Sequence, residues 1–152
     1  EYLGHGKFRV RKGKDEHVEH QVSKFAMIAG GTGITPMRQI IQAIVSNPED
    51  KTEAHLLFAN QTEADILLRE ELDTLAAKDS RVKVWYTLDR PDEATWKFSK
   101  GFVDFDMVSQ HLPKAAEDVS VLMCGPLPMI NFACKPNLEK AGYKPEQFFA
   151  FQ

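Results

Sequence analysis

Short apolar runs alternate along most of the chain with stretches in which apolar residues recur at helical spacing. The apolar runs cover residues 24–29, 53–60, 81–89 and 118–125, and a further run closes the chain at residues 146–152. These runs lack the regular alternation of apolar and polar residues that marks a strand with one solvated face. They are therefore predicted to be strands buried on both faces.

Helical periodicity fills the intervals between these strands. The first interval, residues 36–46, repeats Met37, Ile40, Ile41 and Ile44 at helical spacing. Further helices are expected at residues 64–79 (through Ile66, Leu67, Glu70 and Leu72), at residues 103–112 with a cap near Asp104, and over most of residues 126–142. Residues 90–101 are expected to form a surface loop. The alternation predicts an α/β fold with a Rossmann-like, five-stranded parallel sheet and helices on both faces.

Composition and charge narrow the classes of partner. The chain has 152 residues, of which 43% are hydrophobic, and a net charge of −3 at pH 7; these values are typical of one globular domain. No long basic stretch follows the N-terminal segment, so nucleic acid is not an expected partner. No apolar run approaches the roughly twenty residues that cross a bilayer, and two cysteines are too few for a disulfide framework. We expect a cytoplasmic protein without a membrane segment.

The first 22 residues do not fit the alternating pattern and are predicted to form a polar hairpin or linker that enters the domain. The sequence opens abruptly at Glu1, without a start methionine, as expected of a fragment of a longer chain. His17 and His20 lack the further ligands of a metal site, so no metal is expected.

The first strand ends in a glycine-rich turn, AGGTGITP, at residues 29–36. Gly30 and Gly31 can adopt positive φ or let another group approach the backbone, while Thr35 and Pro36 are expected to cap and begin the helix. Free N–H groups at a helix start form a phosphate site, and a tight turn without any ligand is an equal alternative. Pro36 stands where the ordinary dinucleotide fingerprint has its third glycine, which argues against a standard dehydrogenase.

A second motif, MCGPLPMI at residues 123–130, follows the fourth strand. Because ligands lie at the carboxyl ends of parallel strands, Cys124 is expected in the same layer as the glycine turn if the two strands are neighbours. A buried structural thiol is the alternative, and it is the commoner fate of a free cysteine. A nucleophilic thiolate would need a base, and His111 is the nearest histidine in sequence.

The chain resembles, motif by motif, the pyridine-nucleotide half of the ferredoxin reductase superfamily. The matching motifs are, in order, GGTGITP, LLFANQTEADILLREEL, VWYTLDRP, GFV, MCGPLPMI, KPNLEKAGY and the aromatic ending. Within the superfamily the chain resembles the cytochrome b5 reductase branch, which includes the cytochrome b reductase fragment of assimilatory nitrate reductase. The opening EYLGHGKF, together with WKFS and PNLEKAGY, is more similar to that fragment than to a free-standing reductase.

The resemblance implies a binding site for NADH. Its residues would be Gly30, Gly31, Thr32, Gly33, Thr35, Pro36, Asn60, Gln61, Asp65, Gly125, Pro126, Met129 and Phe151. Cys124 would act in catalysis by placing the nicotinamide against a flavin, with no covalent intermediate. Asp65 matches the position that selects the cofactor, where a carboxylate accepts hydrogen bonds from the adenosine ribose and repels a 2′-phosphate. A helix cap at Asp65 and ordinary strand packing at Phe151 are the alternatives.

The resemblance also implies a domain organisation. Residues 25–152 would be the NADH-binding domain, and residues 1–24 the tail of a flavin domain with its linker or hairpin. The Arg-x-Tyr-Ser/Thr motif that holds FAD in the family does not occur here, so FAD is expected on a separate N-terminal domain of the same polypeptide. Electrons would pass to a b-type cytochrome haem domain and, in a nitrate reductase, to a molybdenum cofactor and nitrate. The alternatives are a free-standing NADH-cytochrome b5 reductase and a non-catalytic, nucleotide-binding regulatory domain.

Overall fold

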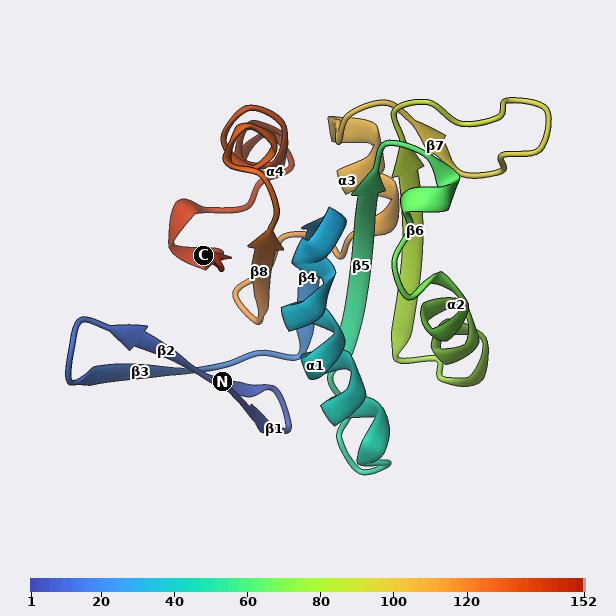
Figure 1. Ribbon diagram of the computed structural model, residues 1–152. Coiled ribbons are helices and arrows are strands. Elements are labelled where there is room, and N and C mark those ends of the chain that lie inside the picture. The colour runs from blue at the N-terminus through green and yellow to red at the C-terminus, as the bar shows by residue number, and fades with distance from the viewer. Residues whose placement is uncertain (152) are drawn as a thin grey trace.

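A parallel sheet of six strands forms the centre of the computed structural model, which describes residues 1–151 (Figure 1). The strands are β4 (Lys24–Gly30), β5 (Glu53–Asn60), β6 (Val82–Leu88), β7 (Ser99–Lys100), β8 (Val119–Cys124) and β9 (Phe148–Ala150). Their order across the sheet is β7-β6-β5-β4-β8-β9, and every neighbouring pair is parallel. The chain builds outward from β4 to one side and then returns to the other, so the strand order reverses between β4 and β8. Parallel α/β sheets bind ligands at such a point.

The predicted α/β class is confirmed, whereas the predicted count of five strands is one too few. The additional strand, β7, is two residues long and lies within residues 90–101, where a loop is expected. It pairs with the end of β6, and Trp85 Nε1 donates a hydrogen bond of 2.8 Å to Ser99 Oγ. Two residues carry no periodicity, so the sequence pattern has no signal for this strand.

Helices cover both faces of the sheet, as predicted. They are α1 (Ile34–Ser46), α2 (Arg69–Lys78), α3 (Phe105–His111) and α4 (Lys135–Lys140), with 3-10 turns η1 (Gly31–Gly33), η2 (Glu63–Asp65) and η4 (Pro145–Gln147) and a π-helical segment η3 (Met129–Cys134). Successive side chains of β4 point to opposite faces. Met27 packs with Ile41 of α1 in one buried core, and Ile28 packs with Val108 of α3 in the other.

The helix after β5 starts later than predicted. It begins at Arg69 instead of Ala64, because Leu68 adopts a left-handed backbone conformation with a φ of 58° that separates α2 from the η2 turn. Ile66 and Leu67 therefore lie outside the helix, although both fit its spacing. Ile66 is buried because the turn itself inserts it into the core.

The start of α1 also differs from the prediction. α1 begins at Ile34 with Gly33 as its N-cap and without a side-chain cap, so the predicted cap at Thr35 is wrong. The η1 turn leads directly into α1, which places Thr35 and Pro36 within the first helical turn. The predicted cap of the helix after β7 is confirmed, because Asp104 accepts a hydrogen bond of 2.9 Å from the backbone N–H of Met107.

The N-terminal residues form a separate antiparallel sheet that projects from the main body in Figure 1. Its strands are β1 (Tyr2–Gly4), β2 (Lys7–Lys12) and β3 (Glu16–Gln21), and β2 and β3 make the predicted hairpin. The Tyr2 hydroxyl donates a hydrogen bond of 2.5 Å to Asp50 Oδ2, and Asp50 is fully buried. Phe8 meets Phe25 of β4 edge-on, with 5.4 Å between ring centroids. These contacts fix the small sheet to the core beneath α1.

The chain closes on β9, which lies within the predicted strand of residues 146–152; Gln152 of that prediction lies outside the described residues. Within residues 1–151, none of the helices combines the length and the apolarity needed to span a bilayer.

Candidate functional site

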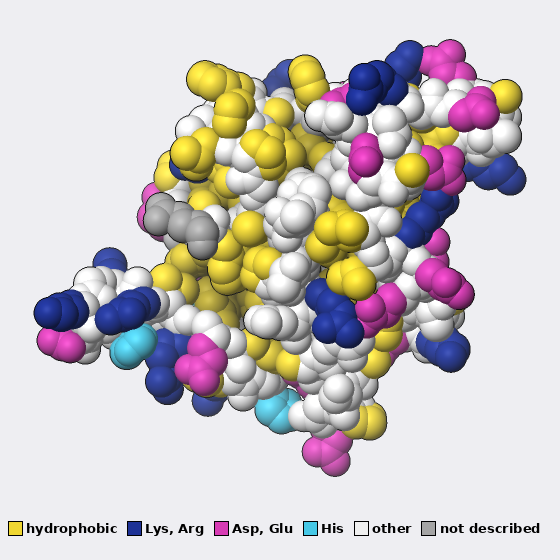
Figure 2. Space-filling view, viewed as in Figure 1, with side chains coloured by type: hydrophobic (Ala, Val, Ile, Leu, Met, Phe, Trp, Pro, Cys, Tyr) yellow, Lys and Arg dark blue, Asp and Glu magenta, His cyan; other side chains and the backbone are white. Residues whose placement is uncertain are grey.

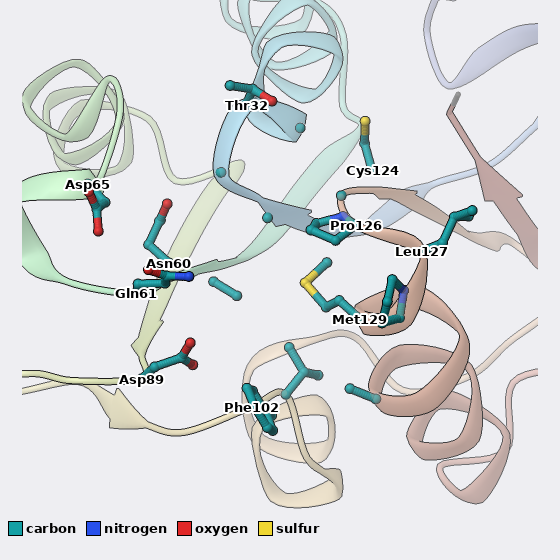
Figure 3. A pocket seen from close by; sticks show the side chains of 18 of the residues that line it. Thr32, Asn60, Gln61, Asp65, Asp89, Phe102, Cys124, Pro126, Leu127 and Met129 are labelled. Carbon is teal, nitrogen blue, oxygen red and sulfur yellow. The ribbon is translucent and has the colours of Figure 1, made fainter.

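A cavity of about 1490 Å³ opens at the carboxyl ends of β4, β5, β6 and β8, around the point where the strand order reverses (Figure 3). The predicted residues that line it are Gly30, Gly31, Thr32, Gly33, Asn60, Gln61, Asp65, Cys124, Gly125, Pro126, Met129 and Phe151. Thr35 and Pro36 are not among its lining residues. The structure thus brings together side chains that lie as much as 121 positions apart in sequence.

The glycines of the turn after β4 serve different purposes. Gly31 has a φ of +56°, whereas Gly30 has an extended backbone with a φ of −126°. A Cβ on Gly30 would lie 2.9 Å from Met129 Sδ, and one on Gly33 would lie 2.1 Å from the carbonyl oxygen of Cys124. Both options expected for the glycines, positive φ and close approach, are therefore realised at different positions. The turn after β4 and the segment after β8 interlock where a side chain would not fit.

The backbone of this turn offers donors to an anion. The N–H group of Ile34 is bonded within the η1 turn and Pro36 has none, so the main chain that faces the cavity near the positive end of the helix dipole is that of Gly31–Gly33. None of the described residues that line the cavity is a lysine or arginine, and the charged ones are Asp65 and Asp89. An anionic ligand would therefore be held by neutral donors, namely the main chain of the glycine turn and the side chains of Thr32 and Asn60.

Cys124 is the last residue of β8 and lies beside Ala29 of β4. Burial raises the pKa of its thiol above the usual value, so the group stays protonated at neutral pH. The nearest histidine in sequence, His111, stacks on Trp85 with 3.8 Å between ring centroids and is not among the lining residues. No histidine is among the described residues that line the cavity, and the protonated Cys124 is suited to contact a ligand as a neutral, polarisable group.

Two carboxylates lie at the other end of the cavity from Cys124 (Figure 3). Asp65 belongs to the η2 turn, where its Oδ2 accepts hydrogen bonds from Thr62 N (3.0 Å) and Thr62 Oγ1 (2.8 Å). The alternative role of Asp65 as the N-cap of the following helix is wrong, because Leu68 is the N-cap of α2, and Asp65 instead completes a capping box whose N-cap is Thr62. Asp89 follows β6, and its backbone N–H donates to the Asn60 carbonyl over 3.1 Å. Among the described residues, none donates a hydrogen bond to the Asp89 carboxylate.

Asp89 is the main polar residue that the sequence reasoning missed, although the signal was available. It directly follows a predicted strand, and polar residues at the carboxyl ends of parallel strands share one edge of the sheet. Asn60, at the same edge, is 9% exposed, and its Nδ2 is the one buried side-chain nitrogen or oxygen among residues 1–151 without a hydrogen-bond partner.

The rim of the cavity is apolar. Phe102, Leu127 and Phe132 are 78%, 66% and 81% exposed, and all three line it. Figure 2 shows hydrophobic side chains gathered on the face that carries α4 and β8. Exposed apolar groups around a cavity mark a surface that contacts a ligand or a partner. Across residues 1–151 the structure holds no cluster of three or more metal-ligating side chains.

Comparison with known proteins places this site among nucleotide-binding reductases. The chain matches the family model described as oxidoreductase NAD-binding domain over residues 27–135. It is 53% identical to NADH-cytochrome b5 reductase 1 of Bos taurus over 152 residues, which is 99% of this chain and 50% of that protein. It is 55% identical to NADH-cytochrome b5 reductase 2 of Danio rerio over 154 residues, 99% of this chain and 49% of that protein. The chain spans about half the length of these curated relatives.

Solved structures give the same picture. The cytochrome b5 reductase domain of Ulva prolifera nitrate reductase superposes with a TM-score of 0.85 and 51% identity, covering 88% of this chain and 52% of that one. The CS-b5R domains of human Ncb5or, in the NAD+ form, superpose with a TM-score of 0.73 and 27% identity, covering 86% of this chain and 37% of that one.

Proposed function

The chain belongs to the family of oxidoreductase NAD-binding domains, and on this premise we propose that it binds NADH and presents the nicotinamide to FAD held by a separate domain of the same polypeptide. The observation that carries the proposal is the single cavity at the point of strand-order reversal, which is lined by the neutral donors of the glycine turn and by the thiol of Cys124. The apolar rim and the two carboxylates complete a site that suits a dinucleotide.

The residues present fit NADH as follows. The main chain of Gly31–Gly33 with the side chains of Thr32 and Asn60 would hold the pyrophosphate, Cys124 would contact the nicotinamide, and Asp65 and Asp89 would accept from the adenosine ribose. FAD supplies a flavin ring that accepts the hydride and releases electrons singly. Cys124 contributes by contact: a protonated thiol beside the nicotinamide sets its orientation without forming a bond to it.

Selection of NADH over NADPH follows from charge. The carboxylates of Asp65 and Asp89 are the charged groups among the described lining residues, and either can accept hydrogen bonds from ribose hydroxyls and repel a 2′-phosphate. Asp65 already accepts two hydrogen bonds from Thr62, whereas the Asp89 carboxylate accepts none from the described residues. We therefore propose that the two act together, with Asp89 the freer acceptor.

Calorimetric titration of the chain with NADH and NADPH, repeated with FAD, tests this proposal. We expect NADH to bind well ahead of NADPH, and FAD not to bind tightly. If neither nucleotide binds, the titration is repeated with the flavin domain present. No NADH binding there, together with no NADH-dependent flavin reduction, would refute the enzyme function. Nucleotide binding without flavin reduction would instead favour a regulatory domain.

The relatives' names suggest where the electrons go next. We propose a b-type cytochrome haem as the acceptor, because the curated relatives are NADH-cytochrome b5 reductases and the Ulva structure is the reductase domain of a nitrate reductase. In a nitrate reductase, the haem would pass electrons to a molybdenum cofactor and nitrate. The longer polypeptide that carries this chain, assayed for NADH-dependent reduction of cytochrome b5 and of nitrate, separates the two enzymes.

The N-terminal residues have a proposed role in that longer polypeptide. We propose that residues 1–24 lead from the flavin domain into the NADH-binding domain at residues 25–152. The anchoring of Tyr2 to Asp50 implies that the β1–β3 sheet moves with the NADH-binding domain.

A further inference from the structure

Arg69 connects segments that border the carboxylate end of the cavity. It is the first residue of α2, and its guanidinium pairs with Glu63 of the η2 turn, which also carries Asp65. Its guanidinium carbon lies over two aromatic rings, 5.5 Å from the centroid of Tyr86 and 5.4 Å from that of Trp96. Trp96 belongs to residues 89–98, the loop between β6 and β7 that begins with Asp89.

A second group of contacts fixes Arg69 itself. Its Nε lies 3.5 Å from Asp73 Oδ2, one turn further along α2. The same carboxylate accepts a hydrogen bond of 2.6 Å from the hydroxyl of Tyr86, which is only 1% exposed. Arg69 is therefore held by the rigid sheet on one side and holds the exposed η2 turn on the other. A planar guanidinium suits this arrangement, because it can stack on rings and pair with a carboxylate at the same time.

The η2 turn has few other ties to the body of the protein. Its remaining hydrogen bonds are local, such as those from Thr62 to Asp65 and from Ile66 N to the Glu63 carbonyl (3.2 Å). It is followed by Leu68, whose left-handed backbone is uncommon for a residue with a side chain. Gln61, two residues before the turn, is bonded to the 89–98 loop, because Arg90 N donates to its carbonyl over 2.8 Å and Arg90 Nη2 to its Oε1 over 3.2 Å. For the η2 turn itself, the burial of Ile66 and the pairing of Glu63 with Arg69 are the ties to the body of the protein.

We propose that Arg69 is a positioning residue that holds the Asp65 turn against the 89–98 loop and thereby sets the ribose selectivity of the nucleotide site. The inference rests on the proposed function, because it concerns the adenosine-ribose end of the same site. Arg69 itself is not among the cavity-lining residues. Removal of the Arg69 side chain lets the η2 turn move. The Asp65 carboxylate then accepts a weaker hydrogen bond from a ribose hydroxyl and repels a 2′-phosphate less.

The test measures binding of ADP-ribose and of 2′-phospho-ADP-ribose by calorimetry, under the condition in which the wild-type chain binds NADH. In Arg69→Met, we expect ADP-ribose to bind about threefold to tenfold more weakly and its advantage over the 2′-phosphorylated ligand to shrink. Arg69→Lys keeps a positive charge beside Glu63 but loses the planar group that stacks on the rings. Its preference for ADP-ribose should therefore lie between that of Arg69→Met and that of the wild type. Glu63→Gln breaks the pair and leaves the stack, and it should shift the selectivity in the same direction.

Lys100→Met is the matched control, because it removes an exposed ion pair with Glu93 of the same loop and leaves the Arg69 contacts in place. Thermal unfolding of each variant reports stability separately. Equal weakening of both ligands in Arg69→Met and in Glu63→Gln would show general loosening and overturn the inference, as would unchanged binding of both. If the wild-type chain binds ADP-ribose no better than its 2′-phosphate, the proposed ribose recognition fails and this inference fails with it.

Discussion

Replacing Gly33 with alanine puts a methyl group where the main chain of the neighbouring segment already lies. The added Cβ would be 2.1 Å from the Cys124 carbonyl oxygen, 2.5 Å from the Cys124 carbonyl carbon and 3.1 Å from Gly125 N. The first distance is about 1.3 Å shorter than an ordinary van der Waals contact, which begins near 3.4 Å. All three neighbours are backbone atoms, so no side chain can rotate away to make room.

The magnitude follows from what has to move. β4 and β8 are paired through Ala29 and Cys124, so relief of the clash requires the glycine turn and the segment after β8 to separate by about 1 Å. Overpacking of this kind costs about 1–3 kcal/mol in the free energy of unfolding. Misplacement of a positioning group by about 1 Å costs about 10²-fold in rate. We therefore expect Gly33→Ala to fold less stably and to reduce flavin with NADH about a hundredfold more slowly.

Urea unfolding of the chain gives the stability, and single-turnover flavin reduction with the flavin domain present gives the rate. Gly13→Ala is the matched control: its φ of +81° strains a side chain, but nothing lies within 4 Å of the added Cβ, and the residue is in the β2–β3 turn away from the cavity. It should lose stability through backbone strain and keep the wild-type rate. A Gly33→Ala variant with wild-type stability and rate would refute the close approach of the two segments.

Three further predictions concern other parts of the molecule. Asp89→Asn and Asp65→Asn should each raise NADPH binding relative to NADH, with the larger change at Asp89; an unchanged ratio in both variants would refute ribose recognition by these carboxylates. Cys124→Ser should lower the rate of flavin reduction about tenfold or more while NADH affinity changes less than about threefold, and a loss confined to affinity would contradict an orienting role. Tyr2→Phe should cost about 1–3 kcal/mol by urea unfolding, because it removes a hydrogen bond to a buried carboxylate. Burial alone would raise the pKa of Asp50, but hydrogen bonds from Thr52, Tyr2 and His5 N lower it, so their stabilisation is present above the unfolded pKa near 4. This stabilisation is lost as the pH falls through the lower pKa of Asp50 in the folded protein. The free energy of unfolding should therefore fall less steeply with decreasing pH in Tyr2→Phe than in the wild type. Parallel curves of unfolding free energy against pH for the two proteins would argue against this account.

The strands were predictable because burial on both faces leaves a continuous apolar run. β5 coincides with the predicted residues 53–60, and β6 lies within 81–89. The start of α2 was not predictable in the same way, because Ile66 satisfies helical spacing for a different reason: the η2 turn buries it. Spacing alone does not distinguish a helical position from a buried turn residue. The left-handed Leu68 that ends the turn has no sequence signal, since leucine rarely adopts this conformation.

The apolar rim of the cavity shows another limit of sequence reasoning. Phe102 and Phe132 are largely exposed, although aromatic side chains usually pack in a protein core. Phe102 precedes α3 and Phe132 lies within η3, so their exposure depends on how these segments lie against the sheet, which is a property of the tertiary arrangement. The glycine turn and Cys124 were found because strand ends share one sheet edge by construction, whereas Asn60 was named by the family resemblance.

The glycine turn supports a nucleotide site less directly than its motif indicates. Gly30 and Gly33 are required by the close approach of Met129 and of the Cys124 carbonyl oxygen, and this requirement holds whether or not a phosphate binds. The glycines are therefore compatible with a tight turn that has no ligand, and their presence cannot choose between the two interpretations. What favours the phosphate is that the main chain of Gly31–Gly33, the Thr32 hydroxyl and the unpartnered Asn60 Nδ2 all line a cavity that no described lysine or arginine lines, because neutral donors at a helix start suit an anion. It follows that Gly33→Ala should destabilise the chain even without NADH, whereas only the ligand-bound protein can report on the N–H groups.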